Sequence, residues 1–225
     1  MDPVIHAVLF DFSGTLFHFE PDVDGQPFNR ARLIDTLTSP TTPTRFLTGE
    51  LLEAWERRDL DVDVHRTVYL AALHAAHPGV PDDAIEAVYR LVASPESWQP
   101  YPDTIPALRT LRELGIPVAV VSNIPWHTRG VFERVGAAGL VDEYVHSFEE
   151  GVMKPDPKIF LAACQRIGVA PEDTLMVGDN EEADGGATAV GCRFVTVARV
   201  PPSDRPNALL GALAAHGLRL TGHKQ

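Results

Sequence analysis

Short apolar runs rich in β-branched residues alternate with segments of helical periodicity along most of this 225-residue chain. The predicted strands are residues 4–10, 116–121, 143–146, 174–177 and 194–197. Between them, segments such as 104–114 and 157–167 carry apolar residues at the spacing of one helix face. Strands and helices that alternate in this way favour right-handed βαβ units. The pattern therefore predicts an α/β fold, a doubly wound parallel sheet with helices on both faces.

Residues 17–101 interrupt this alternation. A polar stretch rich in proline and aspartate is followed by helical patterns at 30–37, 43–59, 64–76 and 82–93, without a convincing strand among them. We expect an all-helical cap over residues 17–101, inserted after the first strand, with hinges near 17–20 and 98–102. Residues 1–16 and 102–225 would then form the core. Such caps close over a site and exclude water from it.

Charge and composition exclude several classes of function. The formal net charge of −12 argues against nucleic acids or anionic membranes as partners. No apolar run is long enough to span a bilayer, and the N-terminal residues lack the features of a signal peptide. Cys164 and Cys192 have no metal-ligand spacing and are expected to be buried, reduced thiols. We expect a soluble, cytoplasmic protein, either a monomer or a homodimer, that acts on a small molecule.

Polar side chains follow the predicted strands at the points where they end. Asp11 follows the first strand, Ser122 ends the second, and Asp179 follows the fourth, while Lys154 opens a later helix. In an open parallel sheet, ligands bind beyond the carboxyl ends of the strands, so we expect these residues to converge in one crevice. The full candidate set is Asp11, Ser13, Gly14, Thr15, Ser122, Asn123, Lys154, Asp179 and Asp184.

This combination of residue types suits phosphoryl transfer. A carboxylate such as Asp11 can attack phosphorus and divide one difficult step into two through an aspartyl-phosphate. Asp11 and Asp179, together with a main-chain carbonyl, offer the oxygen ligands that Mg²⁺ prefers. Lys154 and the metal would neutralise the transferring group, while Ser122 and backbone N–H groups hold its oxygens. Gly14 permits a tight turn that directs its N–H toward the phosphate.

The segments DFSGTL, VSN, GVMKPDPKIF and VGDNEEAD occur in this order and resemble the four motifs of the haloacid dehalogenase-like hydrolases. The resemblance covers roughly residues 5–197, and the helical insertion resembles the smallest cap type of that family. It implies that Asp11 is the nucleophile and a Mg²⁺ ligand and that Ser13 offers its main-chain carbonyl to the metal. Asp179 would be the second acidic ligand, and Asp184 would support the metal site.

The same resemblance assigns the residues that hold the substrate. Ser122 and Lys154 would grip the phosphoryl group as part of the catalytic set. Gly14, Thr15 and Asn123 are expected to form the substrate-binding part of the site.

Ser13 departs from the family pattern. In typical phosphatases of the family, the residue two after the nucleophile is a second Asp, which protonates the leaving group. General acid catalysis contributes about 10²–10⁴-fold to the rate, or roughly 3–5 kcal/mol of barrier. Ser13 should therefore slow the hydrolysis of an ordinary alkyl phosphate unless another group supplies the proton. Three kinds of relative manage without this acid: haloacid dehalogenases, phosphonatases with a cap lysine, and transport ATPases with Thr at this position.

The sequence distinguishes among these relatives. Residues 17–101 contain no lysine, which argues against a phosphonatase. The acidic pair Asp179 and Asp184 argues against a dehalogenase, which does not use Mg²⁺, although Arg30 or Arg45 could bind a substrate carboxylate from the cap. We predict a magnesium-dependent phosphatase acting on a small phosphorylated metabolite. A carbon–halogen hydrolase and a weakly active or inactive binding protein are the alternatives. The substrate-selecting cap residues are expected among Arg30, Arg45, Trp55 and Arg58.

Overall fold

The computed structural model of the chain describes residues 4–24, 28–39 and 42–219. Its centre is a five-stranded sheet in the order β5-β4-β1-β6-β7, with all neighbouring strands parallel. The strands are β1 (Ala7–Phe10), β4 (Val118–Ser122), β5 (Glu143–His146), β6 (Thr174–Gly178) and β7 (Arg193–Thr196). The predicted parallel α/β sheet is confirmed, although its first strand begins at Ala7 rather than at residue 4.

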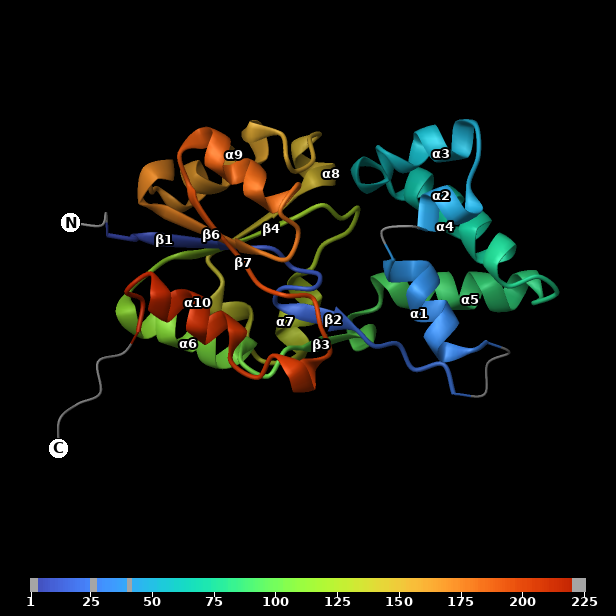
Figure 1. The fold of residues 1–225 in the computed structure, drawn as a ribbon, viewed down its shortest axis with the longest axis horizontal. Helices are drawn as coiled ribbons and strands as arrows, with labels where there is room; N and C mark the ends of the chain where they lie inside the picture. Colours follow the sequence, from blue (N-terminus) through green and yellow to red (C-terminus); the bar gives the residue numbers. More distant parts are fainter. Residues whose placement is uncertain (1–3, 25–27, 40–41, 220–225) are drawn as a thin grey trace.

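Helices cover both faces of the sheet (Figure 1). One face carries α6 (Thr104–Leu114), α7 (Arg129–Arg134) and α10 (Ala208–Ala215), and the other carries α8 (Ser147–Glu150) and α9 (Pro157–Ile167). Successive side chains of β1 point to opposite faces: Val8 and Phe10 pack in one buried cluster with Leu108, and Leu9 packs in the other with Ile159. A strand covered on both faces needs an apolar residue at every position, and every residue of β1 is buried.

Short 3₁₀ segments lie between these elements. They are η3 (Ala138–Leu140), η4 (Pro171–Asp173), η5 (Asp184–Val190) and η6 (Pro202–Asp204). The segment between β6 and β7 is η5, a 3₁₀ segment that ends directly before Gly191. It starts at Asp184, so the last carboxylate of the candidate set stands at the beginning of a helical segment packed against α9 and β6.

The inserted segment is helical between its ends and lies to one side of the sheet (Figure 1). Its elements are α1 (Arg30–Thr38), α2 (Thr42–Phe46), α3 (Glu50–Trp55), η1 (Arg58–Leu60), α4 (Val62–Ala76), α5 (Asp82–Ala93) and η2 (Pro95–Ser97). The helical pattern at 43–59 is divided into three elements, which corrects our prediction of one continuous segment. Gly49, between α2 and α3, has a φ of 55°, a left-handed conformation that helical backbone does not adopt.

Two short strands mark the beginning and end of this insertion. Strand β2 (Phe17–Phe19) pairs antiparallel with β3 (Trp98–Pro100), and Phe19 lies opposite Trp98. The prediction of an all-helical insertion is therefore wrong at both ends, because three-residue strands are too short to show a period of two. The ribbon lies between the sheet and the helices in Figure 1, where we expected the hinges. We retain residues 17–101 as the proposed cap and residues 1–16 and 102–225 as the proposed core.

Within the described ranges, no helix has both the length and the apolar character needed to cross a membrane. The two cysteines are free and buried, as expected. Cys164 is in α9 and Cys192 directly precedes β7. Although the two cysteines are 28 residues apart in the sequence, their Sγ atoms lie 3.9 Å apart.

Candidate active site

Asp11 is the first residue beyond β1. Its backbone N–H donates to the Val177 carbonyl at 3.0 Å, so the side chain is fixed between β1 and β6 at the carboxyl edge of the sheet. Only 7% of the residue is exposed. Burial raises the pKa of Asp11 to about 6, against the opposing effect of the Lys154 ammonium group.

Lys154 joins two carboxylates that come from different parts of the chain. Its Nζ donates to Asp11 Oδ1 and to Asp184 Oδ1, at 2.6 Å in each case. Burial opposes the charge of the ammonium group, but the two carboxylates outweigh it and raise the pKa of Lys154. The residue is 5% exposed and therefore carries a buried positive charge directly beside Asp11. This is the position from which a cation can balance charge on a group bound at Asp11.

Asp179 completes a group of three carboxylates. One oxygen each from Asp11, Asp179 and Asp184 lie within 4.8 Å of one another. Thr15 Oγ1 donates to Asp179 Oδ1 at 3.4 Å, and Arg199 Nη1 lies 3.6 Å from Asp179 Oδ2. Burial raises the pKa of both Asp179 and Asp184. Three buried carboxylates facing one another form a donor set that fits Mg²⁺, since a divalent cation would offset their mutual repulsion.

Two glycines allow the backbone to approach these carboxylates closely. Gly14 has a φ of 89°, and a Cβ added there would lie 2.4 Å from Asp179 Oδ2. A Cβ at Gly178 would lie 2.1 Å from Asp184 Oδ2. Both distances are shorter than any real contact, so a side chain at either position would displace a candidate metal ligand. The Gly residues of the first and fourth motifs therefore have a direct steric role in the site.

Ser122 and Asn123 lie at the end of β4, but their side chains are placed differently. Ser122 is the last residue of β4 and is 2% exposed. The Asn123 amide binds the backbone of Lys154: its Nδ2 donates to the Lys154 carbonyl at 2.9 Å, and the Lys154 N–H donates to its Oδ1 at 2.7 Å. We predicted Asn123 as a substrate-binding residue. In the structure its side chain holds Lys154, which indicates a positioning role.

We expect Asn123→Ala to lower kcat by about 10- to 100-fold, because a small displacement of Lys154 misplaces its charge. The loss of two partly buried hydrogen bonds should also lower the free energy of unfolding by about 1–3 kcal/mol. Steady-state kinetics with an aryl phosphate separates the two roles of Asn123. A raised KM with unchanged kcat would show that Asn123 contacts the substrate instead.

Arg205 holds the loop after Asp11 from the C-terminal part of the chain. Its guanidinium donates to the carbonyls of Gly14 at 2.8 Å and Thr15 at 3.0 Å, and it lies 3.8 Å from the ring centre of Tyr101. Ser13 is half-buried in the same loop and forms an isolated bridge with Phe17. Nothing in the sequence marked Arg205, because its partners are backbone carbonyls about 190 residues away.

Of the four candidate cap residues, Trp55 is buried and Arg58 is half-buried against it. Trp55 is 7% exposed, and the Arg58 guanidinium lies 4.3 Å from its ring centre. Arg45 is 47% exposed and pairs with Asp35 at 2.6 Å, which occupies it at the surface. The Arg30 side chain lies outside the described part of the structure.

Asp59 is a cap residue that our sequence analysis missed. It is 5% exposed and lies 3.2 Å from Arg58 Nη2, and burial raises its pKa to about 6. Its backbone carbonyl accepts a hydrogen bond of 2.5 Å from Ser147 Oγ of α8. This bond joins the proposed cap to the proposed core. The positive charges of Arg58 and Lys154 lower the pKa of Asp59, but burial outweighs them.

Three curated relatives show the range of similarity. Glyceraldehyde 3-phosphate phosphatase of Methanopyrus kandleri is 42% identical over 103 residues, 45% of this chain and 44% of that protein. Phosphoserine phosphatase of Thermus thermophilus is 34% identical over 146 residues, 63% of this chain and 57% of that protein. (S)-2-haloacid dehalogenase 1 of Pseudomonas sp. is 27% identical over 212 residues, 89% and 87% of the two chains. The chain thus spans about half the length of the two phosphatases.

The fold and the family are shown by two further comparisons. A crystal structure of a dehalogenase with an intermediate complex superposes with a TM-score of 0.67 at 22% identity, over 98% of this chain and 100% of that one. The sequence profile of the haloacid dehalogenase-like hydrolases matches residues 5–190, which include all four motifs. The chain therefore belongs to the haloacid dehalogenase-like hydrolases.

Proposed function

We propose that this hydrolase is a magnesium-dependent phosphatase that acts on a small phosphorylated metabolite through an aspartyl-phosphate. The observation that carries the proposal is the group of three carboxylates, Asp11, Asp179 and Asp184. Lys154 forms hydrogen bonds to two of them, Asp11 and Asp184. A dehalogenase has no use for a metal, whereas a group of carboxylate oxygens fits Mg²⁺. Two relatives with phosphatase names support phosphoryl chemistry.

The proposed reaction starts at Asp11. Its carboxylate oxygen forms a bond to phosphorus, the bond from phosphorus to the leaving oxygen breaks, and water then hydrolyses the acyl phosphate. Lys154, 2.6 Å from Asp11, balances charge on the phosphoryl oxygens, and the Ser122 hydroxyl holds one of them. Asp11, Asp179 and the Ser13 carbonyl would hold Mg²⁺ with support from Asp184. When bound, the ion supplies Lewis-acid neutralisation of the phosphoryl group.

The proposed cap provides the substrate-selecting side chains. The candidates that are at least partly buried are Trp55 and Arg58, and Asp59 lies beside Arg58. We therefore propose that this part of the cap contacts the portion of the substrate that is not transferred. We also propose that the protein is cytoplasmic, a monomer or homodimer, and has no nucleic-acid or membrane partner, which the net charge of −12 supports.

Removal of divalent metal tests the proposal directly. We expect a strong chelator to reduce turnover of an aryl phosphate by at least about tenfold, because the metal stabilises charge that develops in the transition state. Excess Mg²⁺ should restore the activity. The control is chloride release from 2-chloropropionate in the same two conditions. Chloride release that the chelator does not affect, without phosphate release, would overturn the proposal in favour of a dehalogenase.

A protein that binds Mg²⁺ but turns over neither substrate would support the binding-protein alternative. Calorimetric titration with Mg²⁺ separates this outcome from loss of the site. The proposal requires both metal binding and turnover of at least one phosphate ester.

A further inference from the structure

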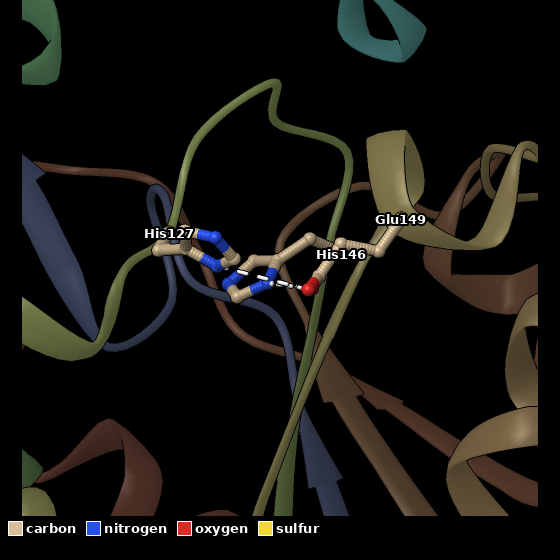
Figure 2. Close-up of side chains that lie close together, drawn as sticks. All are labelled: His127, His146 and Glu149. Carbon is tan, nitrogen blue, oxygen red and sulfur yellow. Dashed lines mark hydrogen bonds and ion pairs between the residues drawn. The ribbon is translucent and has the colours of Figure 1, made fainter.

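A second group of potential metal ligands lies at the same edge of the sheet, outside the carboxylate site. It consists of His127, His146 and Glu149, whose donor atoms lie within 4.8 Å of one another (Figure 2). His127 is in the loop after β4, His146 ends β5, and Glu149 is in α8. His146 pairs with Ser122 in the register of the two strands. The group is therefore one strand away from the candidate active site.

The Glu149 carboxylate contacts both imidazole rings. Its Oε2 is 2.7 Å from His146 Nδ1, and its Oε1 is 3.8 Å from His127 Nδ1. The two rings are nearly perpendicular, at 80°, with centroids 5.6 Å apart. Figure 2 shows both rings directed toward the same carboxylate from different elements. The ligand atoms of His127, His146 and Glu149 therefore lie close enough for small side-chain movements to place all three around one ion.

The buried ring of His146 has a hydrogen-bond partner at its second nitrogen, Nε2. Thr128 Oγ1 lies 3.0 Å from His146 Nε2, on the side away from Glu149. Metal-binding histidines usually form a hydrogen bond through the nitrogen that does not bind the metal, which fixes the ring and its tautomer. With the proton on Nε2, the ring donates to the Thr128 hydroxyl and leaves Nδ1 free to bind a cation. In the structure the Thr128 backbone N–H donates to His146 Nε2 at 3.3 Å. This long hydrogen bond is lost when Nε2 carries the proton.

The group is open to an ion from solvent. The His127 side chain is 68% exposed and that of Glu149 is 36% exposed, whereas that of His146 is 1% exposed. Arg166 pairs with Glu150 and donates to the Tyr144 carbonyl, so its charge already has partners outside this group. One buried and two accessible ligands therefore form a site that has an entry path.

The donor types indicate which metal this site selects. Two imidazole nitrogens with one carboxylate oxygen suit Zn²⁺ and similar transition metals, whereas Mg²⁺ prefers oxygen ligands alone. We propose that His127, His146 and Glu149 form a binding site for Zn²⁺ or a similar transition metal, distinct from the carboxylate site at Asp11. Three protein ligands leave a fourth position for water. The bound ion would join the loop after Ser122 to α8, the helix whose Ser147 contacts the proposed cap.

A Zn²⁺ titration of the full chain in excess Mg²⁺ tests this site, because Mg²⁺ competes with Zn²⁺ for oxygen ligands such as those at Asp11 but not for imidazole nitrogens. We expect calorimetry to show one tight Zn²⁺ per chain. His127→Gln and Glu149→Gln should each weaken this binding by more than the roughly 10- to 100-fold that loss of an outer-shell partner costs. Both side chains are partly exposed, so the variants should fold. The matched control is His74→Gln, which removes a surface histidine that lies 3.9 Å from Asp82 and should leave binding unchanged.

Co²⁺ provides an independent measurement, because its visible spectrum reports the ligand types. We expect a tetrahedral spectrum without sulfur-to-metal charge transfer, which is lost in His127→Gln. A charge-transfer band would assign the ion to Cys164 and Cys192 and overturn the proposal. Equal Zn²⁺ affinity in wild type, His127→Gln and Glu149→Gln, or no binding in wild type, would also overturn it. Phosphatase activity does not enter these measurements, so the result is independent of the proposed function.

Discussion

Asp11→Asn is expected to abolish phosphate turnover while the protein stays folded. The amide cannot attack phosphorus, and the covalent route through an aspartyl-phosphate is lost with it. We expect a decrease in kcat of at least about 10⁴-fold, since removal of a nucleophile disables the residues that act together with it. Folding should survive because burial already disfavours the charged form of Asp11, whose pKa is raised to about 6. Lys154 also keeps its bond of 2.6 Å to Asp184.

The measurement combines steady-state kinetics on an aryl phosphate with thermal unfolding of the same samples. Asp156→Asn is the matched control: Asp156 lies two residues after Lys154 and caps α9 by accepting from the Lys158 N–H at 2.9 Å. Asn caps helices as well as Asp does, so this variant should retain its activity. A folded Asp11→Asn protein that keeps a substantial fraction of wild-type turnover would refute the nucleophilic role of Asp11.

The part of the fold that the sequence predicts well is the part set by local pattern. Strands β1, β4 and β6 are runs of mostly apolar residues that are buried at every position, so Leu9 and Phe10 can be assigned to a strand without information from distant residues. Because parallel strands end at one edge of a sheet, the pattern also predicted that Asp11, Lys154 and Asp184 lie close together. The structure places these three side chains in hydrogen-bonding contact.

What the sequence did not predict depends on partners that are distant along the chain. The β2–β3 ribbon forms because Phe19 meets Trp98, and neither three-residue segment has a period of its own. Arg205 acts on the backbone of the Asp11 loop, and backbone acceptors leave no mark in a sequence. Asn123 was assigned to the substrate because of its motif, but its amide binds Lys154. In each case the missing information is which groups meet in three dimensions.

Ser13→Asp is expected to increase turnover of alkyl phosphates, which have poor leaving groups. A carboxylic acid at this position can donate the proton that the Ser13 hydroxyl, with its far higher pKa, cannot readily donate. The gain is bounded by the roughly 10²–10⁴-fold contribution of general acid catalysis. It should nearly vanish for aryl phosphates, whose leaving groups need little protonation. Ser13 is half-buried in the loop that Arg205 holds. A slightly larger side chain at this position therefore does not have to fit into a fully buried core.

The added charge works against part of this gain. Asp11 and Asp179 already face each other with raised pKa values, and a further carboxylate nearby adds repulsion. Arg199, 3.6 Å from Asp179 Oδ2 and 45% exposed, is close enough to offset some of it. Ser13→Asn is the matched control because it has nearly the size of Asp but no acidic proton. The comparison is kcat/KM for paired alkyl and aryl phosphates in wild type and both variants. If Ser13→Asp and Ser13→Asn slow both substrates equally, Ser13 serves chemistry that needs no acid at this position, and our explanation of this departure from the family pattern is wrong.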